Sequence, residues 1–207
     1  LTLNCHEFEA IRGYVQGLGL GFRYDGILRP REDGAKRPEE YRLTPRQVVD
    51  FELQDPRSVP EWQRLIDLYG GPDQLQDTLY VCGGGVHGFH VGANGELTLC
   101  MSSRQPSYSL LQGDFHTGWH HFLKEVRAQK ITKSYPCRSC EFGALCGYCP
   151  EFARLENGDP ESVVEYKCEI AHLRAEHVFG KRGQHEDQQK PLQKIREAPH
   201  HCGQIEA

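Results

Sequence analysis

Four cysteines lie within thirteen residues of this chain, in the stretch CRSCEFGALCGYC at positions 137–149. Thiols grouped this closely have three ordinary uses, which are disulfide bonding, zinc coordination and iron–sulfur cluster binding. Three further cysteines fall in the surrounding sequence. The whole group is Cys82, Cys100, Cys137, Cys140, Cys146, Cys149 and Cys168.

The number and spacing of the cysteines bear on which use applies. The chain has nine cysteines, and an odd number disfavours a closed disulfide framework. A zinc ribbon separates its two Cys-x2-Cys pairs by roughly a dozen residues or more, whereas only five residues separate Cys140 from Cys146. Closely spaced thiolates completed by a distant ligand are more typical of iron–sulfur sites. A structural zinc module remains an alternative.

Composition narrows the classes of partner. The net charge is −5, and basic and acidic residues are mixed along the chain. This argues against a general nucleic-acid or membrane-surface binder. No apolar run approaches the ~20 residues of a membrane span, and no basic segment followed by an apolar core opens the chain. We therefore expect a cytoplasmic protein whose grouped thiols bind metal or act in catalysis.

The first third of the chain reads as alternating strands and helices. Residues 1–28 predict strand, helix and strand, a unit typical of a parallel α/β sheet. A lone cysteine, Cys5, is interpreted there as a small buried hydrophobe. A charged loop spans 30–41. Two helices are then predicted, one from the capping box Thr44-Pro45-Arg46-Gln47 and one from Ser58-Val59-Pro60-Glu61.

The sequence becomes rich in glycine from Tyr80 onward. The stretch FHVGANGELTL predicts a β-hairpin that turns at Asn94-Gly95. Residues 117–129 predict an amphipathic helix, and a short helix is expected over 150–156. A longer helix is predicted to begin at Asp159 and Pro160, with Cys168 on its buried stripe. Residues 181–207 are polar and read as a flexible tail.

The cysteine spacing is recognisable. Cys82 and Cys100 enclose Gly95 with twelve and four residues between, then come Cys137-x2-Cys140-x5-Cys146-x2-Cys149 and finally Cys168. This resembles the SPASM domain, the C-terminal extension of many radical S-adenosylmethionine (radical SAM) enzymes. Six of the seven cysteines and the glycine fit the family pattern. Cys149 departs from it, because two residues separate it from Cys146 where the family has three.

The resemblance implies an organisation for the whole chain. Residues 1–35 look like the end of a radical SAM partial barrel, an α/β remnant. Residues 36–79 would be a helical linker, and 80–180 a small α+β, cysteine-rich SPASM domain with a β-hairpin and helices. Residues 181–207 complete the chain as the polar tail.

The resemblance also implies two auxiliary [4Fe–4S] clusters. The second cluster would be bound by Cys137, Cys140, Cys146 and Cys168, and the first by Cys82, Cys100 and Cys149. Some relatives supply a further cysteine just before the first motif cysteine, but residues 72–81 contain none. The first cluster would therefore have either an open iron or a non-cysteine ligand. The nearest candidates for that ligand are Asp77, His87 and His90.

Radical SAM chemistry also needs a Cys-x3-Cys-x2-Cys motif, which these 207 residues lack. We therefore expect S-adenosylmethionine and a third [4Fe–4S] cluster in an N-terminal part missing from a chain that starts at Leu1, and an inactive fragment without it. The family resemblance implies an oxidoreductase that modifies a peptide or protein, by cross-linking or residue oxidation, with flavodoxin or ferredoxin as reductant. The clusters would transfer electrons or bind substrate. A free-standing iron–sulfur electron carrier is the other alternative.

Overall fold

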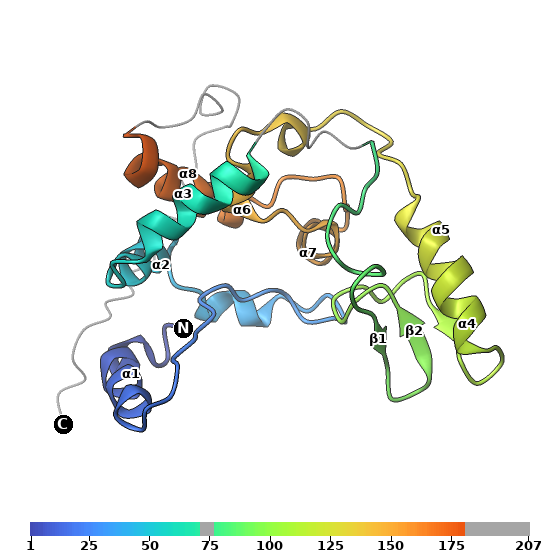
Figure 1. Ribbon diagram of the computed structural model, residues 1–207, viewed down its shortest axis with the longest axis horizontal. Coiled ribbons are helices and arrows are strands. Elements are labelled where there is room, and N and C mark those ends of the chain that lie inside the picture. The colour runs from blue at the N-terminus through green and yellow to red at the C-terminus, as the bar shows by residue number, and fades with distance from the viewer. Residues whose placement is uncertain (71–76, 181–207) are drawn as a thin grey trace.

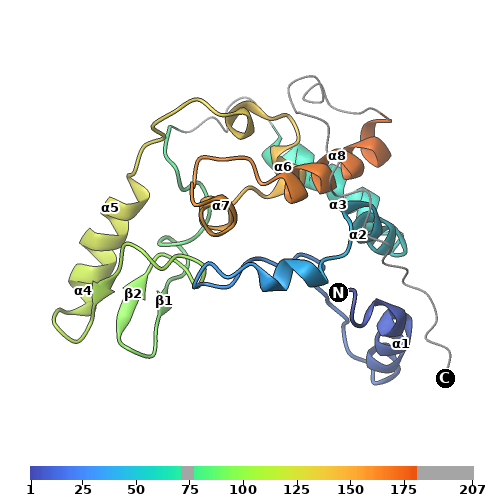
Figure 2. The ribbon, with the colours of Figure 1, turned by 180° about the vertical axis from the view of Figure 1, so that it is seen from behind.

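The computed structural model describes residues 1–70 and 77–180. Helices gather at one end of an elongated molecule, and a small sheet with its covering helices forms the other end (Figures 1 and 2). A separate hydrophobic core lies in each of these two ends, and a third lies around α7 (Pro150–Asn157) between them. Within the described residues, no helix combines the length and apolar character needed to cross a bilayer.

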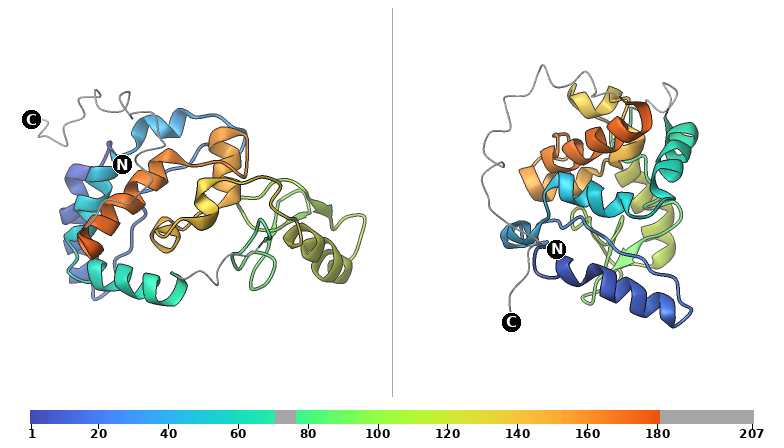
Figure 3. Two further views of the ribbon diagram at one scale, coloured as in Figure 1. Left: turned by 90° about the horizontal axis from the view of Figure 1, so that it is seen from above. Right: turned by 90° about the vertical axis from the view of Figure 1, so that its left-hand side faces the viewer.

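The helical end is built from α2 (Pro45–Leu53), α3 (Ser58–Tyr69), α6 (Gly143–Cys146) and α8 (Glu165–Phe179). The predicted capping box starts α2, because Thr44 and Gln47 each bind the other's backbone N–H. Helix α8 packs against the three other helices (Figure 3). Val49, Trp62, Leu145 and Ile170 are buried in this core. The helices predicted as a linker therefore share a core with the helices that bear cysteines.

The sheet end contains three short antiparallel strands in the order β1 (His90–Val91), β2 (Glu96–Thr98) and β3 (Tyr108–Ser109). The hairpin predicted at Asn94-Gly95 is confirmed, with Val91 opposite Leu97 and Gly95 at a φ of 81°. The third strand was not predicted. A short segment with no alternating pattern becomes a strand only because β2 offers it backbone partners.

The helix predicted over 117–129 is present as three consecutive pieces. They are α4 (Phe115–Thr117), the π-helical stretch η4 (Gly118–Phe122) and α5 (Leu123–Arg127). Asp114 caps the first piece by accepting a hydrogen bond from Thr117 N. Leu123 and Val126 are buried against Leu97 and Leu99 of the sheet end.

The short helix predicted at 150–156 is confirmed as α7, which ends at Gly158 in the left-handed conformation. The predicted start of the next helix at Asp159 is wrong, because α8 begins at Glu165. Asp159 Oδ1 instead accepts a hydrogen bond from Glu161 N at 2.9 Å. The Glu161 carboxylate binds the backbone of Thr132, and these contacts hold 159–164 as a loop.

The N-terminal prediction is partly wrong. The 3-10 helix η1 (Cys5–Glu7) and the helix α1 (Phe8–Gly17) form, but residues 1–4 and 22–28 are not strands. A strand needs a neighbouring backbone to take its hydrogen bonds, and no other described segment pairs with either stretch. Phe22 instead packs edge-on against Phe8. A further 3-10 helix, η2 (Arg37–Tyr41), lies in the charged loop.

Two remaining predictions concern the ends of the chain. Cys5 is buried as expected, with 8% of its surface exposed, and it is also disulfide-bonded. The polar tail predicted for 181–207 lies outside the described residues.

Candidate metal centre

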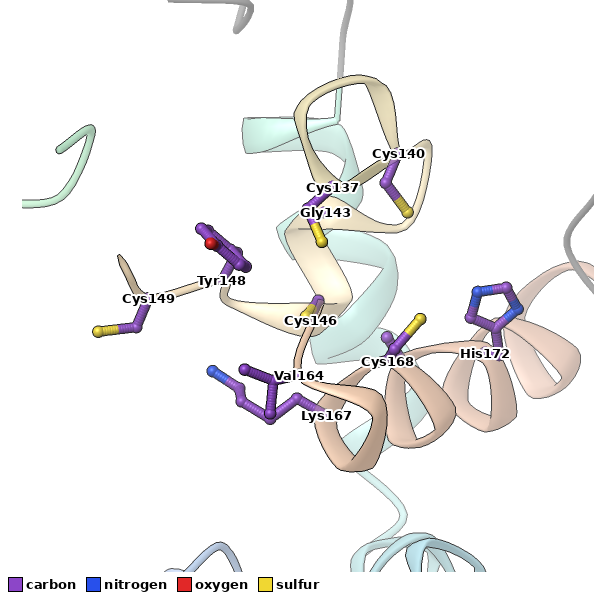
Figure 4. Close-up of a pocket in the computed structure, with 11 residues that line it drawn as sticks. Cys137, Cys140, Gly143, Cys146, Tyr148, Cys149, Val164, Lys167, Cys168 and His172 are labelled. Carbon is purple, nitrogen blue, oxygen red and sulfur yellow. The ribbon is translucent and has the colours of Figure 1, made fainter. Parts of the chain in front are cut away.

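One cavity brings together the four cysteines that the resemblance assigned to the second cluster. We call Cys137, Cys140, Cys146 and Cys168 the cavity set. All four line a single pocket at the helical end of the molecule (Figure 4). The other lining residues are Gly143, Tyr148, Cys149, Val164, Lys167, Ala171 and His172.

Two short elements and one long helix place the cavity set. Cys137 lies in the 3-10 helix η5 (Pro136–Ser139), Cys140 directly follows it, and Cys146 is the last residue of α6. Cys168 comes from α8, across the cavity. Arg174 of α8 donates a hydrogen bond to the Leu145 carbonyl at 2.7 Å. This bond fixes α6 on α8, so residues distant in sequence face one another.

The pKa values of the cavity set report both burial and mutual proximity. Burial, with smaller contributions from the nearby Cys146, Cys168 and Cys140, raises the pKa of the Cys137 thiol to about 12. Burial likewise raises the pKa of Cys146. Thiols that penalise one another's ionisation lie close together, and a bound cation removes the penalty by offsetting their charge. The set is therefore suited to binding metal as thiolates.

Two groups in the wall favour the thiolate form. The backbone N–H of Phe142 lowers the pKa of Cys140 against the larger effect of burial, which raises it. Lys167 donates a hydrogen bond from Nζ to the Gly147 carbonyl at 2.6 Å. From there its positive charge opposes the burial that raises the pKa of Cys146 and Cys149. Backbone donors and nearby cations of this kind stabilise metal-bound sulfur.

Cys149 touches the same pocket but faces elsewhere. Figure 4 shows it beyond Tyr148, with its thiol directed away from the cavity set. Its surroundings include Cys100, whose charge raises the pKa of Cys149 in addition to the larger effect of burial. Cys149 therefore lies both at the wall of the cavity and near Cys100 of the sheet end. We call Cys82, Cys100 and Cys149 the loop set.

Gly84 lies between the Cys82 side chain and the backbone that leads into Cys100. A methyl group at Gly84 would lie 3.6 Å from Cys82 Sγ and 3.2 Å from the carbonyl oxygen of Leu99, which precedes Cys100. The glycine thus lets the Cys82 loop approach the end of β2 closely. The Cys82 loop therefore lies against the end of β2, next to the residue that precedes Cys100.

Each member of the loop set has its own support. Arg127 of α5 donates hydrogen bonds to the carbonyls of Cys82 and Gly84 at 2.7 and 2.6 Å. Thr98 donates its hydroxyl to the carbonyl of Cys100 at 3.1 Å. Cys149 is the N-cap residue of α7, a position where the helix dipole favours a thiolate.

The three candidates for an extra ligand have different surroundings. Asp77 forms an ion pair with Lys130 at 2.7 Å. His90 lies on β1 with Nδ1 at 3.5 Å from the hydroxyl of Thr98. His87 lies in the loop that follows Cys82, with its ring against Gly83. Of the three, His87 is therefore the one whose ring lies against the residue that follows Cys82.

The geometry also bears on the choice between zinc and a cluster. A zinc ion holds four thiolates at about 2.3 Å, which brings their sulfurs within about 3.8 Å of one another. In residues 1–70 and 77–180, no three His, Cys, Asp or Glu side chains are arranged to hold a metal ion. The cavity set surrounds a space instead of meeting at a point. The four thiols of the cavity set are among the donor groups that line this space.

Three residues of this cavity with polar side chains were not predicted from the sequence, namely Tyr148, Lys167 and His172. Tyr148 and Lys167 are each adjacent to a cysteine of the motif, and this adjacency was the available signal. His172 follows Cys168 by one helical turn on α8, a spacing that places both on one face. No protein-family model, curated protein or solved structure matches this chain.

Proposed function

We propose that this chain is the auxiliary-cluster portion of a radical SAM enzyme of the SPASM type, acting on a peptide or protein in the cytoplasm. One observation carries the proposal. Of the seven free cysteines in the described residues, five line one pocket. One of these five, Cys149, also lies near Cys100, which supports the two ligand sets that the family resemblance implies. The cavity set would hold the second [4Fe–4S] cluster, and the loop set would hold the first.

The chemistry of the donors supports this cofactor. The backbone carbonyls of Cys82, Cys100 and Leu145 accept side-chain hydrogen bonds, so the backbone near three of the cysteines is held in place before metal binds. Burial keeps the metal-free thiols protonated, and binding therefore releases protons. The clusters would supply electron transfer or a binding site for substrate, with flavodoxin or ferredoxin as reductant. The part of the enzyme that binds S-adenosylmethionine would lie outside these 207 residues.

Metal analysis tests the proposal. After anaerobic reconstitution the full chain should be brown and should hold about eight iron and about eight sulfide ions, as two [4Fe–4S] clusters require. Cys137→Ala and Cys100→Ala should each retain about half of the iron. The double variant should retain almost none. A colourless protein with stoichiometric zinc would instead establish a zinc module.

Two further measurements separate an enzyme part from an electron carrier. The reconstituted chain should not generate 5′-deoxyadenosine from S-adenosylmethionine, because it lacks the Cys-x3-Cys-x2-Cys motif. Sequencing the gene upstream of Leu1 should show that motif in frame. An upstream stop codon, together with intact clusters, would favour the free-standing carrier.

A further inference from the structure

We propose that His87 binds the first cluster as its fourth ligand, alongside Cys82, Cys100 and Cys149. This inference rests on the proposed function, since it presupposes a cluster at the loop set. The sequence left the fourth ligand of the first cluster open, as either a vacant iron position or one of three side chains, and the proposal selects one of the three. The described residues contain seven free cysteines, of which four belong to the cavity set. A fourth cysteine for the loop set is therefore not present among them.

The backbone of residues 83–88 folds His87 back toward Cys82. His87 N donates to the Gly83 carbonyl at 2.8 Å, and Val86 N donates to the same carbonyl at 3.1 Å. As a result, a methyl group at Gly83 would lie 3.3 Å from Cδ2 of the His87 ring. The imidazole thus lies against the residue that directly follows Cys82.

Two contacts fix this turn relative to Cys100. Gly85 has a φ of 69°, and a methyl group there would lie 2.7 Å from Leu99 Cδ1. The turn therefore packs closely on the residue before Cys100. Arg127 donates hydrogen bonds to the carbonyls of residues 82 and 84. These contacts hold the turn that carries Cys82 and His87 against Leu99, the residue before Cys100.

The two other candidates have contacts of their own. The Asp77 carboxylate would have to give up the ammonium of Lys130, and its backbone is held by the Ile131 N–H at 2.9 Å. His90 Nδ1 faces the Thr98 hydroxyl. Within the described residues, no hydrogen bond or ion pair is formed by the His87 ring, which is exposed. A neutral imidazole is also an established ligand of iron–sulfur clusters.

A histidine ligand changes the charge of the cluster and therefore its midpoint potential. A neutral imidazole in place of a thiolate makes the cluster more positive by one charge, which stabilises the reduced state. Imidazole ligation raises the potential of iron–sulfur centres for this reason. The first cluster should therefore have a higher midpoint potential than an all-cysteine cluster in the same position.

The experiment uses the full reconstituted chain labelled with ¹⁵N-histidine. Pulsed EPR of the reduced protein should show a ¹⁵N coupling to a cluster, and this coupling should be lost in His87→Ala and retained in His90→Ala. Substituting His87→Cys should restore four-ligand binding and lower the midpoint potential of one of the two clusters. The His87→Cys variant and the labelled wild type remain informative if His87→Ala folds poorly.

The outcomes separate this inference from the proposed function. Two clusters with no ¹⁵N coupling in the wild type, or a coupling that survives His87→Ala, would overturn His87 as the ligand and leave the clusters standing. A coupling lost in His90→Ala instead would assign the other histidine and overturn the inference as well. A chain that takes up no iron would overturn both.

Discussion

The phenol of Tyr80 donates a hydrogen bond to the carboxylate of Glu151 across 2.5 Å, and both side chains are buried. Tyr80 lies two residues before Cys82, and Glu151 lies two residues after Cys149. The bond therefore joins the two segments that deliver loop-set cysteines from opposite sides. It also links the core of the sheet end, which contains Tyr80, to α7.

Removing this bond should destabilise the protein and loosen the loop set. Tyr80→Phe leaves the Glu151 carboxylate buried without its phenolic donor, and such losses cost about 1–3 kcal/mol. Urea denaturation should show this decrease, and a chelator should remove about half of the iron faster than in the wild type. The control is Tyr69→Phe, at a position that is 58% exposed. Unchanged iron release in Tyr80→Phe would show that the bond does not position the loop set.

Acid should weaken the contact between the Glu161 carboxylate and residues Thr132 and Lys133. The carboxylate of Glu161 accepts the Thr132 hydroxyl and the N–H groups of Thr132 and Lys133, and these bonds lower its pKa below the ordinary 4.5. A lowered folded-state pKa gives stability that is present above the ordinary value and is lost as pH falls through the folded value.

This effect is measurable with a neutral variant. Glu161→Gln should have a lower melting temperature than the wild type at neutral pH, and the difference should shrink below about pH 4 as the wild-type carboxylate becomes protonated. Glu125→Gln, on the exposed face of α5, is the matched control and should show little difference at any pH. A difference in melting temperature between Glu161→Gln and the wild type that stays constant with pH would contradict this coupling of stability to the protonation of Glu161.

The charge of Lys167 should tune the clusters. Its ammonium lies near Cys146 of the cavity set and Cys149 of the loop set. Lys167→Met removes a positive charge that favours reduction, so midpoint potentials should fall by an amount on the order of tens of millivolts. Lys167→Arg keeps the charge and should leave them nearly unchanged. Potentiometric titration of the reconstituted chain makes the comparison, and equal potentials in both variants would exclude an electrostatic role.

The turn between Cys146 and Cys149 should be sensitive to a side chain. Gly147 has a φ of 56°, a left-handed conformation, with open space around the position of a Cβ. Gly147→Ala should therefore cost about 1–2 kcal/mol through backbone strain alone. Gly158→Ala, at a φ of 77° and also with open space, should cost a similar amount away from the cysteines. Only Gly147→Ala should also lower the iron content, and equal iron in the two variants would refute a role for this turn in ligand placement.

Sequence reasoning succeeded where a structure depends on residues three or four positions apart. The capping box at Thr44, the hairpin turn at Asn94-Gly95 and the end of α7 at Gly158 are local decisions, and each is present. It failed where remote partners decide. The stretch at 22–28 alternates like a strand but forms no strand pairing with a described segment. Residues 159–164 are a loop, which the hydrogen bond from Thr132 N to the distant Glu161 carboxylate helps to hold.

The sequence by itself determined how many thiols there are and how they are spaced, because spacing is a property of the chain alone. Only the tertiary structure decided which of them share a space. Cys168 joins Cys146 because α6 is fixed on α8 by Arg174, while Cys149, three residues from Cys146, faces away beyond Tyr148 (Figure 4). Side-chain direction is set by the packing of whole elements, which no local spacing encodes.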